Sequence, residues 1–444
     1  MKKFAFAAFL ALGVLAMIAP PAVAQDDKPF TVHGEVRIRG EYTANTGDFD
    51  DNQTEDHTTY WPYRVRLAAE GRFGKNVTAW IEFQNAGIGG ATDGNFFFTG
   101  SQYAPGRNGS DIGGTELDGA EMYQGNIKVK GLWSDSFSVT FGRQEITAGT
   151  ELLLGDLDFY TGISHDGITG TIDFKKWDLM LLYTRVQQGD LLTIFGGNYL
   201  PNFPPDQVIP INFGIGSTDF YGGYATFAVG KHNFDVYALD LRNHQVDFDV
   251  ITYGGRYSWN NPDGFFWNVE YAMQTGEISA TTDVGGDVME AWLGYHFGKK
   301  HAIWAKYAWA TGEDGAGDFD GFIPLFGDFH NRLGRGDWFR LDADSTDLPG
   351  SPDQGVVAMA VGYTGNYSAK TEWGVAYWDY AAEEDTGLTE DGLGQAIDVY
   401  ISYKYSDNLT FSASGSQFMP DDGLTGGGVD DAVWRVYGQA RIRF

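Results

Sequence analysis

The chain has 444 residues, including 61 Gly, 13 Trp, 24 Tyr and 32 Phe, with no cysteine and a formal net charge of −30. The absence of cysteine excludes a disulfide framework. The acidic balance argues against a general nucleic-acid-binding protein, which needs a basic surface. Abundant glycine and aromatic residues are typical of membrane β-barrels with aromatic girdles.

The first residues have the features of a secretory signal peptide. Met1 to Lys3 form a positive start, residues 4–18 are almost continuously apolar, and residues 22–24 (Ala-Val-Ala) fit a cleavage site. We therefore expect residues 1–24 to be removed and residues 25–444 to form a single domain. No lipid anchor is expected, because no cysteine follows the apolar run. After residue 24, no segment reaches the ~20 apolar residues that a membrane-spanning helix needs.

Alternation of apolar and polar residues, the pattern of barrel strands, recurs through the rest of the chain. The alternating segments are, in chain order, 30–44, 60–71, 77–84, 116–130, 137–144, 166–174, 177–187, 219–228, 232–243, 249–257, 264–274, 286–297, 301–310, 356–366, 368–379, 394–405, 409–416 and 432–444. About eighteen strands, an even number, would place both ends of a single-chain barrel on one side of the membrane.

The links between these segments alternate in length. Tight links rich in Gly, Asn, Asp and Pro follow the even-numbered segments and suit hairpin turns. Long links follow most odd-numbered segments, and the largest are 85–115, 145–165, 188–218 and 311–355. Short periplasmic turns and long extracellular loops are the outer-membrane pattern. The predicted fold is therefore all-β: a transmembrane, antiparallel, up-and-down β-barrel of about 18 strands.

The long links are acidic. Segment 311–348 contains nine Asp and Glu residues against three arginines. One interpretation is a solvated acidic surface. The other is bound divalent cation that bridges to lipopolysaccharide phosphate, because calcium prefers clustered oxygen ligands. No segment has the spacing of an EF-hand.

The last segment shows most clearly which residues face the lumen, because its apolar residues alternate with arginines and end in Phe444. A one-residue slip would put three arginines into lipid, at about 2–4 kcal/mol each near the midplane. In a closed barrel the last strand pairs with the first, so parity predicts a wall of seven inward arginines: Arg37, Arg39, Arg64, Arg66, Arg435, Arg441 and Arg443. We also expect the strand that ends in Phe444 to be recognised by the barrel-assembly machinery.

This wall has two interpretations. Glu35, Glu41 and Glu70 lie on the same strands and could pair with the arginines, which would then only fill the wall. Alternatively, the acids on these strands are too few. An uncompensated arginine wall attracts anions and holds carboxylates through two N–H groups. Charge that lines a pore is a usual source of its ion preference.

Arg256 and Lys306 are further inward candidates, and inward aromatic residues such as Trp292 could stack on sugar faces. An enzyme would need a nucleophile, a base and an orienting group in one place, and no such set is evident. The eight histidines lack metal-ligand spacing. We therefore predict no enzymatic activity, no catalytic residue, no metal site and no cofactor.

Several segments together resemble the alginate-export porins of the outer membrane. They are YRVRLAAEGRFGKNVTAWIEFQNAG (63–87), VTFGRQEITAGTELLLGD (139–156), ISHDGITGTIDF (163–174) and YAWATGEDGAGDFDGFIPLFGDFHNRLGRGDW (307–338). The resemblance implies an eighteen-stranded, monomeric barrel with a basic conduit for a polyuronate. It suggests roles for Arg64, Arg66, Arg143 and His330. Parity places Arg143 outward, although a bulge near the strand end could change that.

The chain departs from a strongly basic pore, because 30 Lys and Arg stand against 60 acids. The predicted function is a passive outer-membrane channel for anionic solutes, such as alginate or its oligomers, in a Gram-negative bacterium. A general diffusion porin and a plugged, surface-binding barrel are the alternatives. Its expected partners are outer-membrane lipid, lipopolysaccharide and anionic carbohydrate or small anions, with no nucleic acid. The segment 311–355 could fold into the mouth as a lid or constriction.

Overall fold

The computed structural model describes residues 29–46, 49–52, 57–89, 120–160, 162–187, 217–244, 247–313, 317–341, 355–384, 388 and 390–444. The predicted signal peptide, residues 1–24, lies outside these residues, as do most of the links 85–115 and 188–218. Among the described residues, no helix is long and apolar enough to span a membrane.

The regular secondary structure of the described residues is β-strand, apart from the four-residue helix α4 (Asp422–Thr425). The strands are β1 (Phe30–Ala44), β2 (Thr58–Tyr60), β3 (Pro62–Phe73), β4 (Val77–Ile88), β5 (Glu121–Lys130), β6 (Phe137–Gln144), β7 (His165–Asp173), β8 (Trp177–Gln187), β9 (Thr218–Val229), β10 (His232–Asn243), β11 (Phe248–Asn260), β12 (Phe265–Ser279), β13 (Thr282–Val284), β14 (Asp287–Phe297), β15 (His301–Thr311), β16 (Gly355–Ser368), β17 (Thr371–Ala381), β18 (Gly392–Lys404), β19 (Leu409–Pro420) and β20 (Val433–Arg443).

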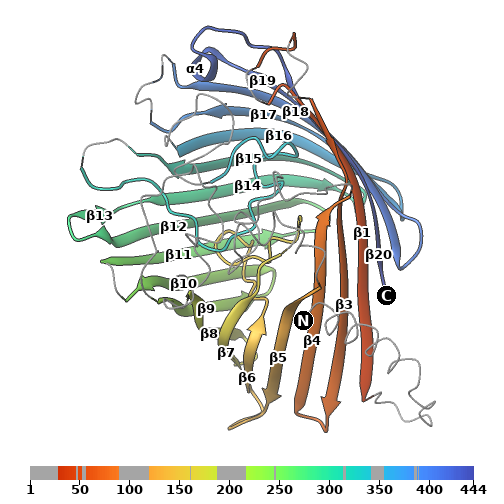
Figure 1. Ribbon diagram of the computed structural model, residues 1–444, viewed down its shortest axis with the longest axis vertical. Helices are drawn as coiled ribbons and strands as arrows, with labels where there is room; N and C mark the ends of the chain where they lie inside the picture. Colours follow the sequence, from red (N-terminus) through yellow and green to blue (C-terminus); the bar gives the residue numbers. More distant parts are fainter. Residues whose placement is uncertain are drawn as a thin grey trace.

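These strands form one antiparallel sheet that closes on itself (Figure 1). The last strand, β20, pairs with the first, β1, from Glu35 opposite Arg443 to Ala44 opposite Trp434. The three-residue strands β2 and β13 only extend the pairing of β1 and β12. The other eighteen strands form the barrel, which confirms the predicted fold class and strand number.

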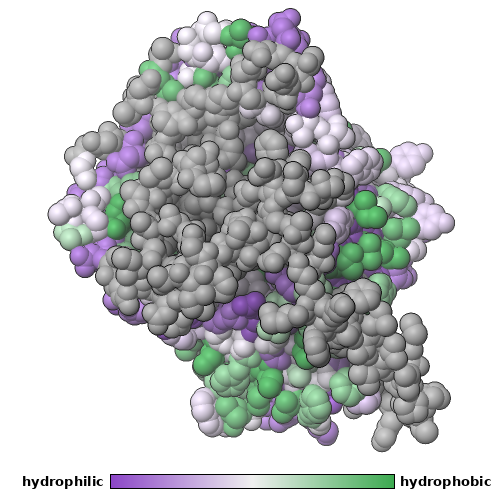
Figure 2. Space-filling model, in the orientation of Figure 1, coloured by the Kyte–Doolittle hydropathy of each residue, from purple (hydrophilic) through white to green (hydrophobic). Residues whose placement is uncertain are grey.

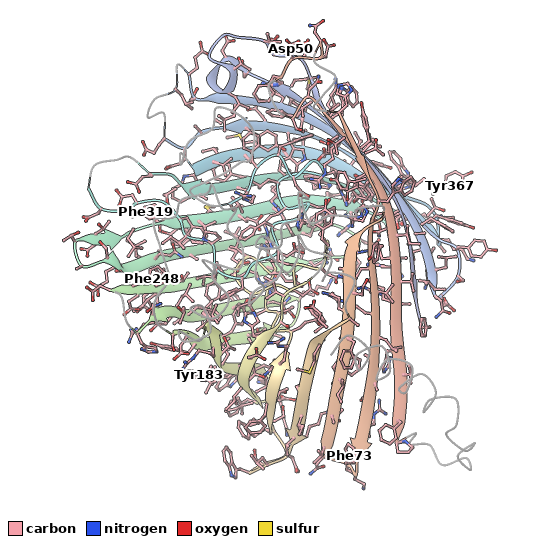
Figure 3. All side chains as sticks on the ribbon, in the orientation of Figure 1. Asp50, Phe73, Tyr183, Phe248, Phe319 and Tyr367 are labelled. Carbon is pink, nitrogen blue, oxygen red and sulfur yellow. The ribbon has the colours of Figure 1, made fainter. Side chains whose placement is uncertain are left out.

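The wall has an apolar outer face, as the alternation predicted. Ile38, Leu293 and Val361 are exposed on this face, whereas their strand neighbours turn inward. Figure 2 shows apolar residues gathered over the lower part of the wall, where Figure 1 places β3, β4 and β5. Exposed aromatic residues such as Phe73 and Tyr367 lie at the short-turn ends of the strands (Figure 3). An apolar band with aromatic ends suits a hydrocarbon layer and its interfaces.

Two of the long links fold back inside the barrel, and we call them the first inner loop (145–160 and 162–163) and the second inner loop (317–341). Leu154 and Phe326 form a parallel bridge between the two loops. The second inner loop also contacts inward-facing wall residues: Gln274 of β12 donates to the carbonyl of Ile323 at 2.7 Å. The buried part of the second inner loop therefore packs against the inner face of the wall, inside the barrel.

The contacts between the inner loops and the wall are largely apolar. Leu152, Phe322 and Phe339 of the loops are fully buried and belong to the same core as Val250 and Phe418 of the wall. Burying side chains of this size contributes about 1.5–3 kcal/mol each. The loops are therefore packed parts of the interior, and they hold their polar residues in fixed positions against the wall.

Candidate functional site

Three neighbouring strands, β3, β1 and β20, place arginines in two rows across the inner wall. One row is Arg64, Arg37 and Arg441, and the next is Arg66, Glu35 and Arg443. We call the five basic residues of these rows the arginine cluster: Arg37, Arg64, Arg66, Arg441 and Arg443. Like charges directly opposite each other destabilise a sheet, so this arrangement requires anionic or carbonyl partners in the lumen.

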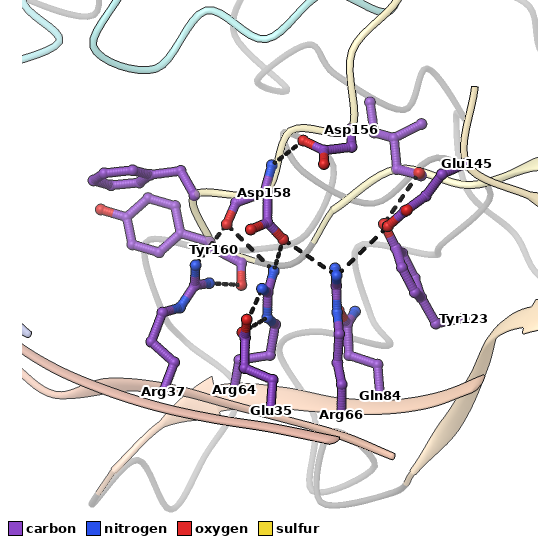
Figure 4. A network of polar contacts seen from close by, with 12 residues as sticks. Glu35, Arg37, Arg64, Arg66, Gln84, Tyr123, Glu145, Asp156, Asp158 and Tyr160 are labelled. Atoms are coloured by element: carbon purple, nitrogen blue, oxygen red, sulfur yellow. Dashed lines mark hydrogen bonds and ion pairs between the residues drawn. The ribbon is translucent and has the colours of Figure 1, made fainter. Parts of the chain in front are cut away.

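Asp158, in the first inner loop, is the central partner of the arginine cluster (Figure 4). Its carboxylate lies 2.6 Å from Arg64, 3.2 Å from Arg66 and 3.6 Å from Arg443. Burial alone would raise the pKa of Asp158, but Arg64 and Arg66 outweigh it and hold that pKa well below the usual range. The loop therefore places a carboxylate that is ionised at neutral pH against the arginines.

Arg37 interacts with the same loop through carbonyl groups. It donates to the backbone oxygens of Asp158 and Tyr160, each at 2.5 Å. Within the part of the chain that the structure describes, neither Arg37 nor Arg441 has an ion pair with a carboxylate. The row of Arg64, Arg37 and Arg441 thus contains the least compensated charges of the cluster.

At the edge of the cluster, Arg66 is held by several groups at once (Figure 4). It lies 3.5 Å from the carboxylate of Glu145, donates to Gln84 at 2.8 Å and stacks 3.9 Å from the ring centroid of Tyr123. Tyr123 in turn donates to Glu145 at 2.6 Å. These contacts fix the position of the guanidinium group beside Asp158.

Glu41 organises the other end of the arginine wall. It lies 2.9 Å from Arg39 and 3.5 Å from Arg435, and it accepts hydrogen bonds from Tyr60 at 2.6 Å and from Tyr160 at 2.9 Å. Because Glu41 is almost completely buried, each of these partners offsets part of the cost of removing its charge from water. The prediction that Glu41 pairs with wall arginines is correct.

His330 of the second inner loop lies beside this end of the wall. Its ring stacks on Phe159 with centroids 4.3 Å apart, and its Nδ1 is 3.0 Å from Asp337. Asp337 is also 3.3 Å from Arg435. Burial acts to raise the pKa of Asp337, but His330 and Arg435 keep that pKa below its usual value. His330 thus connects the two inner loops to the arginine wall.

The structure corrects the expectation that acids are too few to neutralise the wall. That expectation counted only residues on the three strands. The inner loops and β4 add Asp158, Glu145, Asp337 and Glu82, which lie within 4.0 Å of at least one wall arginine. Nearby carboxylates therefore largely neutralise the charge of the seven arginines. The remaining positive charge lies in the row of Arg64, Arg37 and Arg441.

The other two inward candidates are also paired. Arg256 of β11 lies 2.5 Å from Asp235 of β10. Lys306 of β15 lies 2.6 Å from Glu290 of β14 and donates to the carbonyl of Arg332 at 2.6 Å. Both cations face the lumen, as predicted, on the part of the wall away from the arginine cluster.

Arg143 does not line the lumen. It pairs with Asp166 across β6 and β7 at 2.5 Å, on the same face as the exposed Phe141 and Ile168. The strand parity therefore holds to the end of β6, and the role that the resemblance suggested for Arg143 as a pore-lining residue is corrected.

A group of carboxylates that sequence reasoning missed lies where the two inner loops meet. One oxygen each of Glu151, Asp156 and Asp328 lies within 4.8 Å of the others. Burial raises the pKa of all three carboxyl groups, and neighbouring carboxylates raise those of Glu151 and Asp156 further. Because these residues come from two different links, no local spacing in the sequence identifies the group.

Comparisons with known proteins bear on the barrel as a whole. OpdL of Pseudomonas aeruginosa matches with a TM-score of 0.62 and 9% identity, over 94% of this chain and 98% of that one. OccAB3 of Acinetobacter baumannii matches with a TM-score of 0.59 and 12% identity, over 93% and 99%. OccK2 (OpdF) of P. aeruginosa, solved in complex with glucuronate, matches with a TM-score of 0.59 and 10% identity, over 94% and 98%.

The chain has the fold of an outer-membrane porin. No family model and no curated protein sequence matches it. Identities of 9–12% establish the fold alone. The predicted resemblance to porins is therefore confirmed at the level of the barrel, and the comparisons do not support the narrower alginate-export family. The barrel architecture agrees with the predicted location in a Gram-negative outer membrane.

Proposed function

We propose that this protein is an outer-membrane channel for the passive passage of anionic solutes, with small carboxylates and acidic sugars as the solute class. The observation that carries the proposal is the arginine cluster. Five guanidinium groups in two cross-strand rows face the lumen, and the carboxylate of Asp158 in the first inner loop already binds three of them, Arg64, Arg66 and Arg443. A solute carboxylate has the same charge and geometry and can use the same donors.

Two further points support this solute class. OccK2, a porin of the same fold, was solved in complex with glucuronate, an acidic monosaccharide. The row of Arg64, Arg37 and Arg441 also retains positive charge, since Arg37 and Arg441 have no ion pair within the described residues. A polymer such as alginate belongs to the same chemical class, and its passage is the narrower form of the proposal.

A second candidate is a general diffusion porin with little solute preference. The observation that favours it is the pairing of Arg66 with Glu145 and of Arg435 with Asp337, which reduces the field of the wall. The two candidates differ in ion selectivity, so one measurement separates them.

The test is reversal potential and single-channel current of the purified protein in a planar bilayer with a salt gradient, followed by added glucuronate. We expect anion selectivity, block by glucuronate, and loss of both in Arg441→Gln. The control is Arg143→Gln, which removes an arginine from the outer face. An unselective channel supports the second candidate. A cation-selective channel, or equal effects of the two variants, refutes the arginine cluster as the solute path.

A further inference from the structure

A cavity of about 420 Å³ lies between the inner loops and a part of the wall that does not carry the arginine cluster. Three indole rings line it from the wall: Trp292 of β14, Trp304 of β15 and Trp378 of β17. The second inner loop closes it with Asp328, Asn331 and Arg332. Its volume falls in the range of pockets that hold a small organic molecule, about 300–1,000 Å³.

The wall is built to expose these indole faces. Trp304 lies opposite Gly362 in the neighbouring strand β16, and a Cβ atom at Gly362 would come within 2.2 Å of the indole. The absence of a side chain there lets the ring of Trp304 lie across β16. The rings of Trp304 and Trp378 are 6.3 Å apart and inclined by 59°, so they form two walls of a wedge.

The amide group of Asn331 offers a hydrogen-bond donor at the lining of the cavity, whereas the N–H groups of two of the indole rings do not reach its surface. Among the described residues, the indole N–H groups of Trp292 and Trp378 are buried and have no partner. Trp378 as a whole is only 4% exposed. Because these two nitrogens have almost no accessible surface, Trp292 and Trp378 contribute ring surface to the cavity and not hydrogen bonds.

Lys306 adds a further donor. Its ammonium group uses two of its three N–H groups, one on Glu290 and one on the carbonyl of Arg332. It lies 4.7 Å from the ring centroid of Trp292, at the edge of the cavity. The site therefore combines flat aromatic faces with the ammonium group of Lys306 at its edge.

We propose that this tryptophan cavity is a subsite for a pyranose ring, neutral or acidic. A sugar ring has an apolar C–H face that fits against an indole and a rim of oxygens that accept hydrogen bonds. The loop carboxylate of Asp328 and the amide of Asn331 supply partners for hydroxyl groups. This inference rests on the proposed channel function, because the solute must enter the lumen. The tryptophan cavity would select for the ring of the solute, whereas the arginine cluster selects only for its charge.

The test uses glucose, which is uncharged and so has no net attraction to the arginine cluster. Single-channel current is recorded in the full-length protein while glucose is added, with mannitol, an open-chain polyol of similar size, as the matched probe. We expect glucose to interrupt the current and mannitol not to. Trp378→Phe and Trp292→Phe keep an aromatic ring but shorten the face that the sugar would lie against, so each should raise the half-blocking glucose concentration about fivefold.

The control variant is Trp373→Phe, on the same strand as Trp378 but exposed on the outer face. It should leave glucose block unchanged. Equal block by mannitol, or equal effects of Trp373→Phe and Trp378→Phe, would overturn the subsite. Heat-modifiable migration in gels checks that each variant forms the barrel. If Trp378→Phe does not fold, Trp292→Phe tests the inference in its place. An anion-selective channel without sugar block refutes only the subsite, whereas sugar block in a cation-selective channel refutes only the proposed anion path.

Discussion

Neutralising Asp158 is the most direct test of how the first inner loop and the arginine wall work together. In Asp158→Asn, the side-chain shape and the backbone carbonyls that bind Arg37 remain, and only the charge is lost. The carboxylate lies 2.6–3.6 Å from Arg64, Arg66 and Arg443. At such distances, with an effective dielectric constant of about 20, each contact gives roughly 5 kcal/mol before desolvation costs.

We expect Asp158→Asn to lower the stability of the folded protein and to raise its anion selectivity. After desolvation costs, and because Asp158 is 24% exposed, we expect the free energy of unfolding to fall by about 1–3 kcal/mol. An ion that passes about 6 Å away in a water-like medium feels a change of about 0.7 kcal/mol. With salt screening, the anion-to-cation permeability ratio should then rise about threefold.

The assays are reversal potential in a bilayer and urea unfolding in lipid vesicles. The matched control is Asp166→Asn, which removes the partner of Arg143 on the outer face and should leave selectivity unchanged. If Asp158→Asn lowers anion preference, or shifts it no more than Asp166→Asn does, the carboxylate of Asp158 does not control the field in the lumen.

Two further predictions concern the contact between the inner loops. Because the pKa values of Glu151, Asp156 and Asp328 are raised, these carboxylates should lose their charge first as pH falls from neutrality toward the ordinary carboxylate range of about 4. The anion preference of the channel should therefore increase as pH falls over this range. The contribution of the three carboxyl groups to folding stability should increase over the same range. An anion preference that does not change with pH over this range in the native protein refutes this prediction. Leu154 is fully buried, and its backbone forms a bridge with Phe326. Leu154→Ala should lower the free energy of unfolding by about 2–4 kcal/mol and expose the inner loops to trypsin. Unchanged proteolysis in a folded barrel would contradict the packing described.

The strands were predictable because lipid imposes a strong rule on every second residue. A slip in β20 would bury arginines in hydrocarbon, so the parity of Arg435, Arg441 and Arg443 determined their face without any structure. The same rule placed Arg143 outward, and the structure agrees. Inward and outward positions therefore follow from local sequence alone.

The partners of the wall were not predictable in this way. The hydrogen bond from Arg37 to Asp158 joins residues 121 apart in the sequence, and nothing local relates them. One signal was available: residues 322–326 read Phe-Ile-Pro-Leu-Phe, and such an apolar run within a long link suits burial better than an extracellular surface. It indicates that the link folds inward, but not which wall residues it meets.

The position of the arginine cluster has a consequence for how the molecule is made. Arg441 and Arg443 come from the end of the chain, whereas Arg37, Arg64 and Arg66 come from its beginning. The two rows exist only after the terminal strands have joined, so the cluster is absent from every nascent or unclosed intermediate. Until that moment, the edge of β20 that pairs with β1 in the finished barrel lacks this partner, and its backbone N–H and C=O groups are open to other strands. Completion of the barrel and creation of the charged site are thus a single event in biogenesis.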